Sequence, residues 1–138
     1  MRQEIKRIMD YFSRRPEVVA LYIFGSFDTK AERADSDIDV AVMVSPERRD
    51  DFEALKGEYY EASPGFSLKT VDIVILNTAP TYLKHRILKT GRILLDRDPQ
   101  ARKRFLAVAL QEYFDYKFIE DICIGKMKER FAKVAHGQ

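Results

Sequence analysis

The stretch that decides the fold reads Val18-Val19-Ala20-Leu21-Tyr22-Ile23-Phe24-Gly25-Ser26 and resumes, after ten further residues, with Asp37-Ile38-Asp39-Val40-Ala41-Val42-Met43-Val44. Both apolar runs are short and rich in β-branched and aromatic residues, which is typical of buried strands. The first run ends at Gly25, and a glycine at a strand end allows a ligand to approach the backbone closely. Ser26 adds a hydroxyl and a backbone N–H that can bind a phosphate oxygen. The turn at Gly25-Ser26 is therefore predicted to hold phosphates.

Carboxylates occupy one face of the second run. Side chains alternate along a strand, so Asp37 and Asp39 share a face and the apolar residues 38, 40, 42 and 44 share the core face. Asp72 lies inside a later apolar run, 70–76, where an acid is rarely a packing choice. Carboxylates this close repel by about 4 kcal/mol per pair at an effective dielectric of about 20. A divalent cation removes that repulsion, and Mg²⁺ or Mn²⁺ suits an all-oxygen site for phosphoryl or nucleotidyl transfer.

Together, Gly25-Ser26, the ten-residue gap, Asp37-x-Asp39 and the later Asp72 resemble the signature of the DNA polymerase β-like nucleotidyltransferase superfamily. The small size resembles its minimal nucleotidyltransferase (MNT) branch. Residues 83–98 and the aromatic segment 113–118 are similar to the C-terminal half of MNT antitoxins, so the resemblance covers most of the chain. One departure is present: many members carry a basic residue and a glycine where this chain has Thr29 and Lys30.

The resemblance implies a metal-dependent enzyme that transfers AMP from ATP to a tyrosine of a cognate HEPN toxin and thereby silences the toxin. In that interpretation Asp37 and Asp39 hold Mg²⁺ or Mn²⁺, and Asp72 completes the metal site and helps to deprotonate or orient the acceptor hydroxyl. The phosphates lie at Gly25-Ser26, and Lys30 supplies a phosphate-binding charge. Two alternatives stay open: a catalytically inactive antitoxin that binds its toxin sterically, and a nucleotidyltransferase for an aminoglycoside-like small molecule, which usually requires an additional helical domain.

Composition sets broad limits on the protein. A length of 138 residues gives room for one domain, 1–138, and 46% hydrophobic with 33% charged residues is ordinary for a soluble protein. The sequence has no long apolar run, so we expect a cytoplasmic protein with no membrane partner. A net charge of +2 gives no reason to expect a specific nucleic-acid partner. The single cysteine, Cys123, excludes an internal disulfide, and its apolar neighbours predict a packed thiol.

Alternation of helical and strand patterns predicts an α/β (α+β) domain of the nucleotidyltransferase type. We expect a small mixed sheet with helices on one face, which leaves the carboxylate face open. Neither the dinucleotide-binding G-x-G-x-x-G nor a P-loop is present. The expected helices span residues 2–13, 46–62, 81–89 and from 99 onward, and the expected strands span residues 18–24, 37–44, 70–76 and 93–95.

Two C-terminal features concern ligands and partners. The basic residues between Lys84 and Arg104 include candidates for neutralising a triphosphate, but their spacing does not choose among them. The last helix carries more apolar residues between Phe105 and Ile122 than one core-facing stripe requires. This pattern favours an interface with another chain, homo-oligomeric or hetero-oligomeric, and the alternative is a helix sandwiched within its own domain.

Overall fold

The computed structural model describes residues 1–135. It contains a four-stranded sheet, four α-helices and three short 3₁₀ turns, in an order close to that expected from the sequence. The elements are α1 (Gln3–Ser13), β1 (Val18–Phe24), β2 (Ile38–Val44), η1 (Pro46–Asp51), α2 (Phe52–Ala62), η2 (Ser63–Gly65), β3 (Val71–Ile75), η3 (Leu76–Thr78), α3 (Thr81–Thr90), β4 (Arg92–Asp96) and α4 (Pro99–Ala135).

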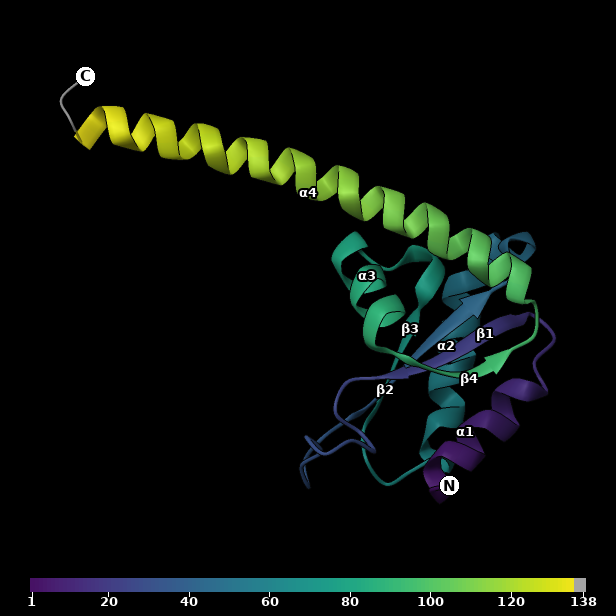
Figure 1. Ribbon diagram of the computed structural model, residues 1–138. Helices are drawn as coiled ribbons and strands as arrows, with labels where there is room; N and C mark the ends of the chain where they lie inside the picture. The colour runs from purple at the N-terminus through teal and green to yellow at the C-terminus, as the bar shows by residue number, and fades with distance from the viewer. Residues whose placement is uncertain (136–138) are drawn as a thin grey trace.

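The sheet has the strand order β3-β2-β1-β4 and is mixed, as predicted (Figure 1). Strand β1 lies antiparallel to both β2 and β4, whereas β2 and β3 are parallel. Parallel neighbours need a long crossover, and α2 with its flanking 3₁₀ turns provides it. Strand β1, which ends before Gly25, and strand β2, which carries Asp39, are central, whereas β3, which carries Asp72, forms an edge.

Helices cover both faces of this sheet, which corrects the expectation of helices on one face. Helices α1 and α2 pack Phe12 and Tyr59 against the face formed by Val40 and the other even-numbered residues of β2. On the opposite face, Met43 packs beneath α3 and the start of α4. The face that carries the carboxylates is thus open only where Asp37 and Asp39 lie. Because Ala41 and Met43 are apolar, that half of the face requires a cover of its own.

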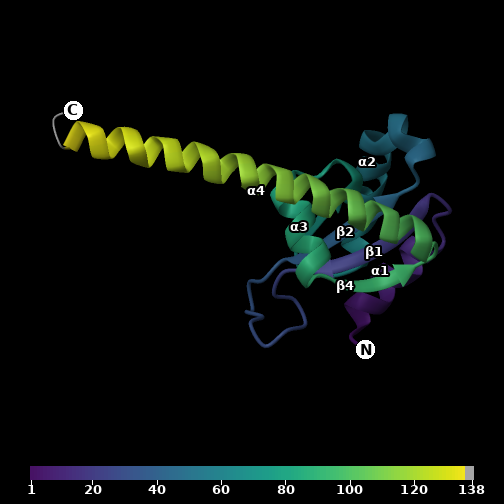
Figure 2. The same ribbon diagram turned by 45° about the horizontal axis from the view of Figure 1, so that its top comes forward.

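Helix α4 begins on the sheet and then continues well beyond the rest of the domain (Figures 1 and 2). Its contacts with α3 include a salt bridge of 3.5 Å between Lys84 and Glu112 and a stack of the His85 and Tyr113 rings, whose centroids lie 3.6 Å apart. Cys123 follows this point and is exposed, so the prediction of a packed thiol is wrong. Within residues 1–135, no helix has the length and apolar character to cross a bilayer.

Candidate active site

Strand register brings the motif residues together at one end of the sheet. Asp39 of β2 pairs with Phe24 at the end of β1 on one side and with Asp72 of β3 on the other. The next residue after Phe24 is Gly25, so the predicted phosphate turn adjoins Asp39. The turn and the Asp37-x-Asp39 pair thus lie on adjacent strands, and Asp72 joins them from the third strand.

The folded protein disfavours the ionised form of Asp39. Burial raises the pKa of Asp39, and the nearby Asp72 and Asp37 carboxylates raise it further, while the Arg86 guanidinium acts in the opposite direction. Within residues 1–135, Asp39 makes neither a side-chain hydrogen bond nor a salt bridge. Asp37 lies just before β2 and is exposed, as is Asp72. The three carboxylates therefore influence one another without an intervening protein cation paired to Asp39.

Gly25 leaves space that the Asp39 carboxylate occupies. It adopts a left-handed conformation with φ of +76°, and a Cβ at this position would lie 2.3 Å from Oδ2 of Asp39. An L side chain would be strained at this φ and would also push the carboxylate away. The backbone conformation and the position of the Asp39 carboxylate therefore both require a glycine at this strand end.

The turn after Gly25 is closed by short polar contacts. Thr29 donates from both its backbone N–H and its hydroxyl to the carbonyl oxygen of Ser26, at 3.1 and 2.5 Å. The Ser26 hydroxyl lies 3.0 Å from the hydroxyl of Ser36, immediately before Asp37. Asp28 takes a positive φ of 58°, which aspartate tolerates better than most residues. Lys30 does not adopt a positive φ, so the glycine that many family members carry at that position is not needed here.

Lys69 and Glu32 hold the loop between Ser26 and Asp37, which projects from the sheet in Figure 2. The Lys69 ammonium donates to three carbonyl oxygens of this loop, those of residues 33, 34 and 36, at 3.2–3.4 Å. Glu32 receives a hydrogen bond of 2.6 Å from Arg2 and lies 3.8 Å from the Lys69 ammonium. Lys30 lies in the same loop and is exposed. No sequence pattern indicates the role of Lys69, because its partners are backbone carbonyls.

Arg86 is the basic residue that the tertiary structure selects from the stretch between Lys84 and Arg104. It acts electrostatically on Asp39, and its guanidinium lies 6.0 Å from the centre of the Phe24 ring. Other cations of the stretch form salt bridges with other acids: Lys84 with Glu112, Arg92 with Asp28, and Arg102 with Asp96. Arg86 makes no salt bridge within residues 1–135, so its charge is available to an anionic ligand.

Tyr60 is a site residue that the sequence did not indicate. Its hydroxyl reaches from α2 to the free edge of β3 and lies 2.8 Å from Oδ1 of Asp72. It also accepts a hydrogen bond of 2.8 Å from the backbone N–H of Ile73. The helical pattern of α2 marks Phe52, Leu55 and Tyr59 as core positions, and Tyr60 falls outside that stripe.

The donor chemistry fits Mg²⁺ or Mn²⁺, although the side chains do not form a complete cage. No three His, Cys, Asp or Glu side chains of residues 1–135 are arranged to hold a metal ion by themselves. Mg²⁺ commonly takes only one or two protein carboxylates and completes its shell with water and substrate phosphates. Asp37 and Asp39 provide that number: Asp37 is exposed, and Asp39 is half-buried.

A family model described as polymerase beta, nucleotidyltransferase, matches residues 6–100. The chain belongs to this family. The matched part of this nucleotidyltransferase contains the whole sheet, all three aspartates and Arg86, and the match ends at the beginning of α4. No curated protein matches the chain.

Solved structures show the same fold at low sequence identity. A crystal structure of a toxin-antitoxin with AMP-PNP is 23% identical, with a TM-score of 0.67 over 92% of this chain and 99% of the other chain. A chain from a structure of tri-AMPylated Shewanella oneidensis HEPN toxin in complex with MNT antitoxin is 22% identical, with a TM-score of 0.63 over 91% of this chain and 96% of the other. A chain from the toxin-antitoxin MntA-HepT is 21% identical, with a TM-score of 0.62 over 91% and 97%.

Proposed function

We propose that this nucleotidyltransferase transfers AMP from ATP to a tyrosine hydroxyl of a HEPN-type toxin, and that the protein acts as the toxin's antitoxin. The observation that carries the proposal is the meeting of Asp39, Asp72 and the Gly25 turn at one end of the sheet in a chain of this family. The similar folds found in a complex with AMP-PNP and in a complex with a tri-AMPylated HEPN toxin support ATP as the nucleotide and a toxin as the acceptor.

Each residue of the site has a distinct task in this reaction. The acceptor oxygen attacks the α-phosphorus of ATP, a new O–P bond forms, and the bond from the α-phosphorus to the β-phosphate oxygen breaks, which releases pyrophosphate. Asp72 receives the proton of the acceptor hydroxyl and passes it to water. The Gly25-Ser26 turn, Lys30 and Arg86 bind the triphosphate. When bound at Asp37 and Asp39, Mg²⁺ or Mn²⁺ would supply the charge that stabilises the attacking and leaving oxygens.

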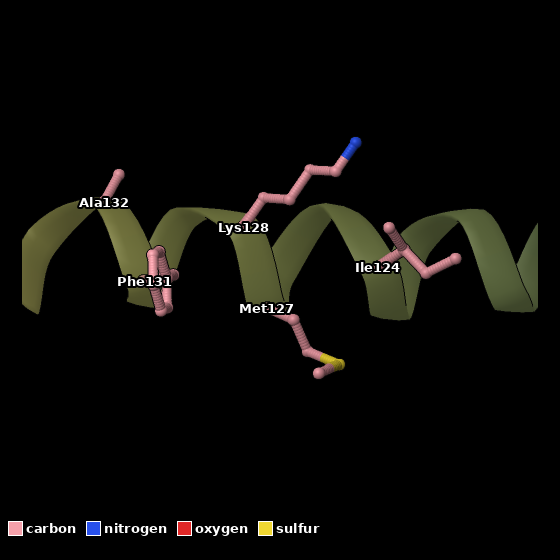
Figure 3. Close-up of a pocket in the computed structure, with 5 residues that line it drawn as sticks. All are labelled: Ile124, Met127, Lys128, Phe131 and Ala132. Carbon is pink, nitrogen blue, oxygen red and sulfur yellow. The ribbon is translucent and has the colours of Figure 1, made fainter.

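Helix α4 is the surface that we assign to the toxin. Its exposed large apolar side chains continue from the point where the helix leaves α3 almost to its end: Phe114, Tyr116, Phe118, Ile119, Ile122, Ile124, Met127, Phe131 and Val134. Figure 3 shows how Ile124, Met127 and Phe131 project from successive turns of the helix. Large exposed apolar surfaces mark interaction sites in soluble proteins. The alternative of a helix sandwiched within its own domain therefore does not apply to this part of α4.

Charge beside the apolar residues favours a different chain over a second copy. Residues 126–133 contain Lys126, Lys128, Arg130 and Lys133 with one acid, Glu129. Two copies paired along this segment would bring like charges together, whereas a partner with acidic residues around an apolar ridge would be attracted. The proposal therefore places an acidic helical face of the toxin on α4.

A transfer assay with differently labelled ATP tests the enzymatic part of the proposal. A candidate HEPN-type toxin would be incubated with the purified protein, Mg²⁺ and ATP labelled at either the α- or the γ-phosphate. We expect label from the α-position alone to remain on the toxin, and mass spectrometry to locate AMP on a tyrosine. Asp39→Asn should abolish labelling, and the exposed loop variant Asp35→Asn should preserve it. Label from the γ-position would indicate phosphoryl transfer and contradict the proposal.

Separation of the two proteins distinguishes covalent from steric neutralisation. The observation that favours the steric alternative is the exposed apolar surface of α4, which can serve binding with or without catalysis. If neutralisation is covalent, the toxin should remain inactive after this protein has been removed, and the Asp37/Asp39 double variant should fail to neutralise it. If neutralisation is steric, the toxin should recover activity on separation, and the double variant should neutralise as well as the unaltered protein.

A further inference from the structure

The hydroxyl of Tyr60 links the edge of the sheet to one oxygen of Asp72. Because β3 is the edge strand, the outward backbone groups of Ile73 have no neighbouring strand to bind. The Tyr60 hydroxyl binds there, 2.8 Å from the Ile73 nitrogen and 3.1 Å from its carbonyl oxygen. The same oxygen atom lies 2.8 Å from Oδ1 of Asp72.

Proton counting decides how these contacts operate. A phenol has one proton to donate, and its oxygen can accept from the Ile73 N–H at the same time. Two acceptors compete for that proton, and the Asp72 carboxylate is both nearer and charged, which makes it the stronger acceptor. Burial raises the pKa of Tyr60, and the bond to Asp72 raises it too, so the phenol keeps its proton at neutral pH. One carboxylate oxygen is therefore fixed, and Oδ2 stays free of protein hydrogen bonds within residues 1–135.

The neighbouring Tyr59 provides an internal comparison. Its hydroxyl also binds a carboxylate, with 2.9 Å to Oε1 of Glu17, but both residues are buried in the core away from the motif residues. Tyr60 instead has 37% of its surface exposed and adds little to the core. If Tyr60 served only to cap the strand edge, its contacts with Ile73 would be sufficient. The additional hydrogen bond to Asp72 therefore indicates a second role.

We propose that Tyr60 is a positioning residue that holds Asp72 in the orientation needed to accept the proton of the attacking hydroxyl, an inference that rests on the role proposed for Asp72. Asp72 is exposed on an edge strand, where an unrestrained carboxylate would sample several rotamers. A catalytic group must be held within a fraction of an ångström of its productive place, and supporting hydrogen bonds supply that restraint. The bond from Tyr60 anchors the carboxylate to the backbone of its own strand.

The test uses Tyr60→Phe in the full chain, with α-labelled ATP, Mg²⁺ and the toxin acceptor. Loss of one hydrogen bond to a charged group should lower kcat about tenfold. The KM for ATP should change less than twofold, because the triphosphate is held by other residues. Tyr59→Phe is the matched control: it removes a phenol from the same helix, and its effect should appear in thermal stability while kcat is maintained.

A double-mutant cycle separates positioning from a merely structural role. In single-turnover measurements, Tyr60→Phe should cost nothing further once Asp72 has been replaced by Asn, because its effect passes through the carboxylate. Equal costs in the two backgrounds would overturn the inference, and so would an unchanged kcat with a raised KM in the single variant. If transfer by Asp72→Asn is too slow to measure, the kcat and KM of Tyr60→Phe, compared with those of the unaltered protein, decide whether the inference holds. A fully active Asp72→Asn would instead refute the role of Asp72 itself, an outcome distinct from failure of the Tyr60 inference.

Discussion

Asp39 carries a conflict between packing and charge at the scale of single residues. Its backbone lies in a central strand, its side chain is half-buried, and two further carboxylates act on it. Arg86 stabilises the Asp39 charge electrostatically, but no cation among residues 1–135 forms a salt bridge with Asp39. Such an arrangement disfavours the ionised form in the free protein and favours a bound cation, which is the behaviour expected of a metal ligand.

Asp39→Asn should stabilise the metal-free protein at neutral pH. Because the folded-state pKa of Asp39 is raised above its unfolded value of about 3.8, the contribution of this group to stability is full below that value. The contribution is lost as pH rises through the folded-state pKa. Thermal melts in EDTA should therefore show a Tm advantage of the variant that grows as the pH rises above about 3.8 and through the folded-state pKa of Asp39. A pH-independent difference, or the same trend in Asp35→Asn, would contradict this assignment.

Arg86→Gln should weaken the use of ATP without unfolding the protein. Arg86 is exposed and lies outside the salt bridges formed by residues 1–135, so its removal costs little packing. A charged contact with a triphosphate contributes enough for its loss to raise the KM for ATP about tenfold. Steady-state kinetics across ATP concentrations would measure the change. Lys89→Gln, one turn along α3, serves as the control and should leave the KM unchanged.

The strand ends show how elements create the site. The end of β1, the start of β2 and the start of β3 meet because the register pairs Phe24 with Asp39 and Asp39 with Asp72. A shift of one residue in β2 would turn both Asp37 and Asp39 toward the hydrophobic core. The apolar residues 38–44 therefore fix the position of the carboxylates as well as the packing of the sheet.

Gly25→Ala should disable the site through the geometry of the β1 turn. A left-handed φ costs an L-residue about 1–2 kcal/mol, and the added Cβ would lie 2.3 Å from Oδ2 of Asp39. We expect the rate of transfer to fall about 100-fold. Urea denaturation should show an unfolding free energy lower by about 1–2 kcal/mol. Gly57→Ala is the matched control, since its added Cβ inside α2 would meet no atom within 4 Å apart from its chain neighbours and the backbone of the helix itself. That change should stabilise the protein by about 0.5–1 kcal/mol.

Helix α4 gives the whole molecule two distinct parts. The sheet with its covering helices contains the candidate site, whereas the part of α4 beyond Tyr113 carries exposed apolar residues away from it (Figure 1). The part of α4 beyond Tyr113 contributes little to the core of the domain. Its exposed residues can therefore be altered without loss of the fold, which makes the partner proposal directly testable.

Phe131→Glu should weaken association with the HEPN partner and leave the nucleotidyltransferase folded. Phe131 has 78% of its surface exposed, so the change removes apolar contact area while the Tm should stay the same. At the centre of an interface an aromatic residue commonly contributes enough for a loss of about 30-fold or more in affinity. Calorimetric titration would measure it. Glu129→Gln, two residues earlier and on the opposite side of the helix, should bind normally; equal binding by Phe131→Glu would remove this part of α4 from the interface.

The sequence by itself determined the features that depend on local pattern. Alternation along residues 18–24 and 37–44 identified the strands, the glycine and aspartates identified the candidate site, and the resemblance identified the family that the match to residues 6–100 confirms. The excess of apolar residues between Phe105 and Ile122 likewise indicated more than one core-facing stripe, and several of these residues are exposed in the structure. These features can be recognised in the sequence because periodicity and backbone conformation depend on residues that are close along the chain.

The tertiary structure alone decided what depends on contacts across long sequence separations. It placed Arg86 near Asp39, brought Tyr60 to Asp72, and covered half of the carboxylate face with α3 and α4. It also exposed Cys123, because α4 leaves the sheet before reaching it. A basic stretch or a tyrosine on a helix looks the same in sequence whether or not it reaches a carboxylate. The difference arises only when the packing of helices on the sheet fixes which side chains meet at a strand end.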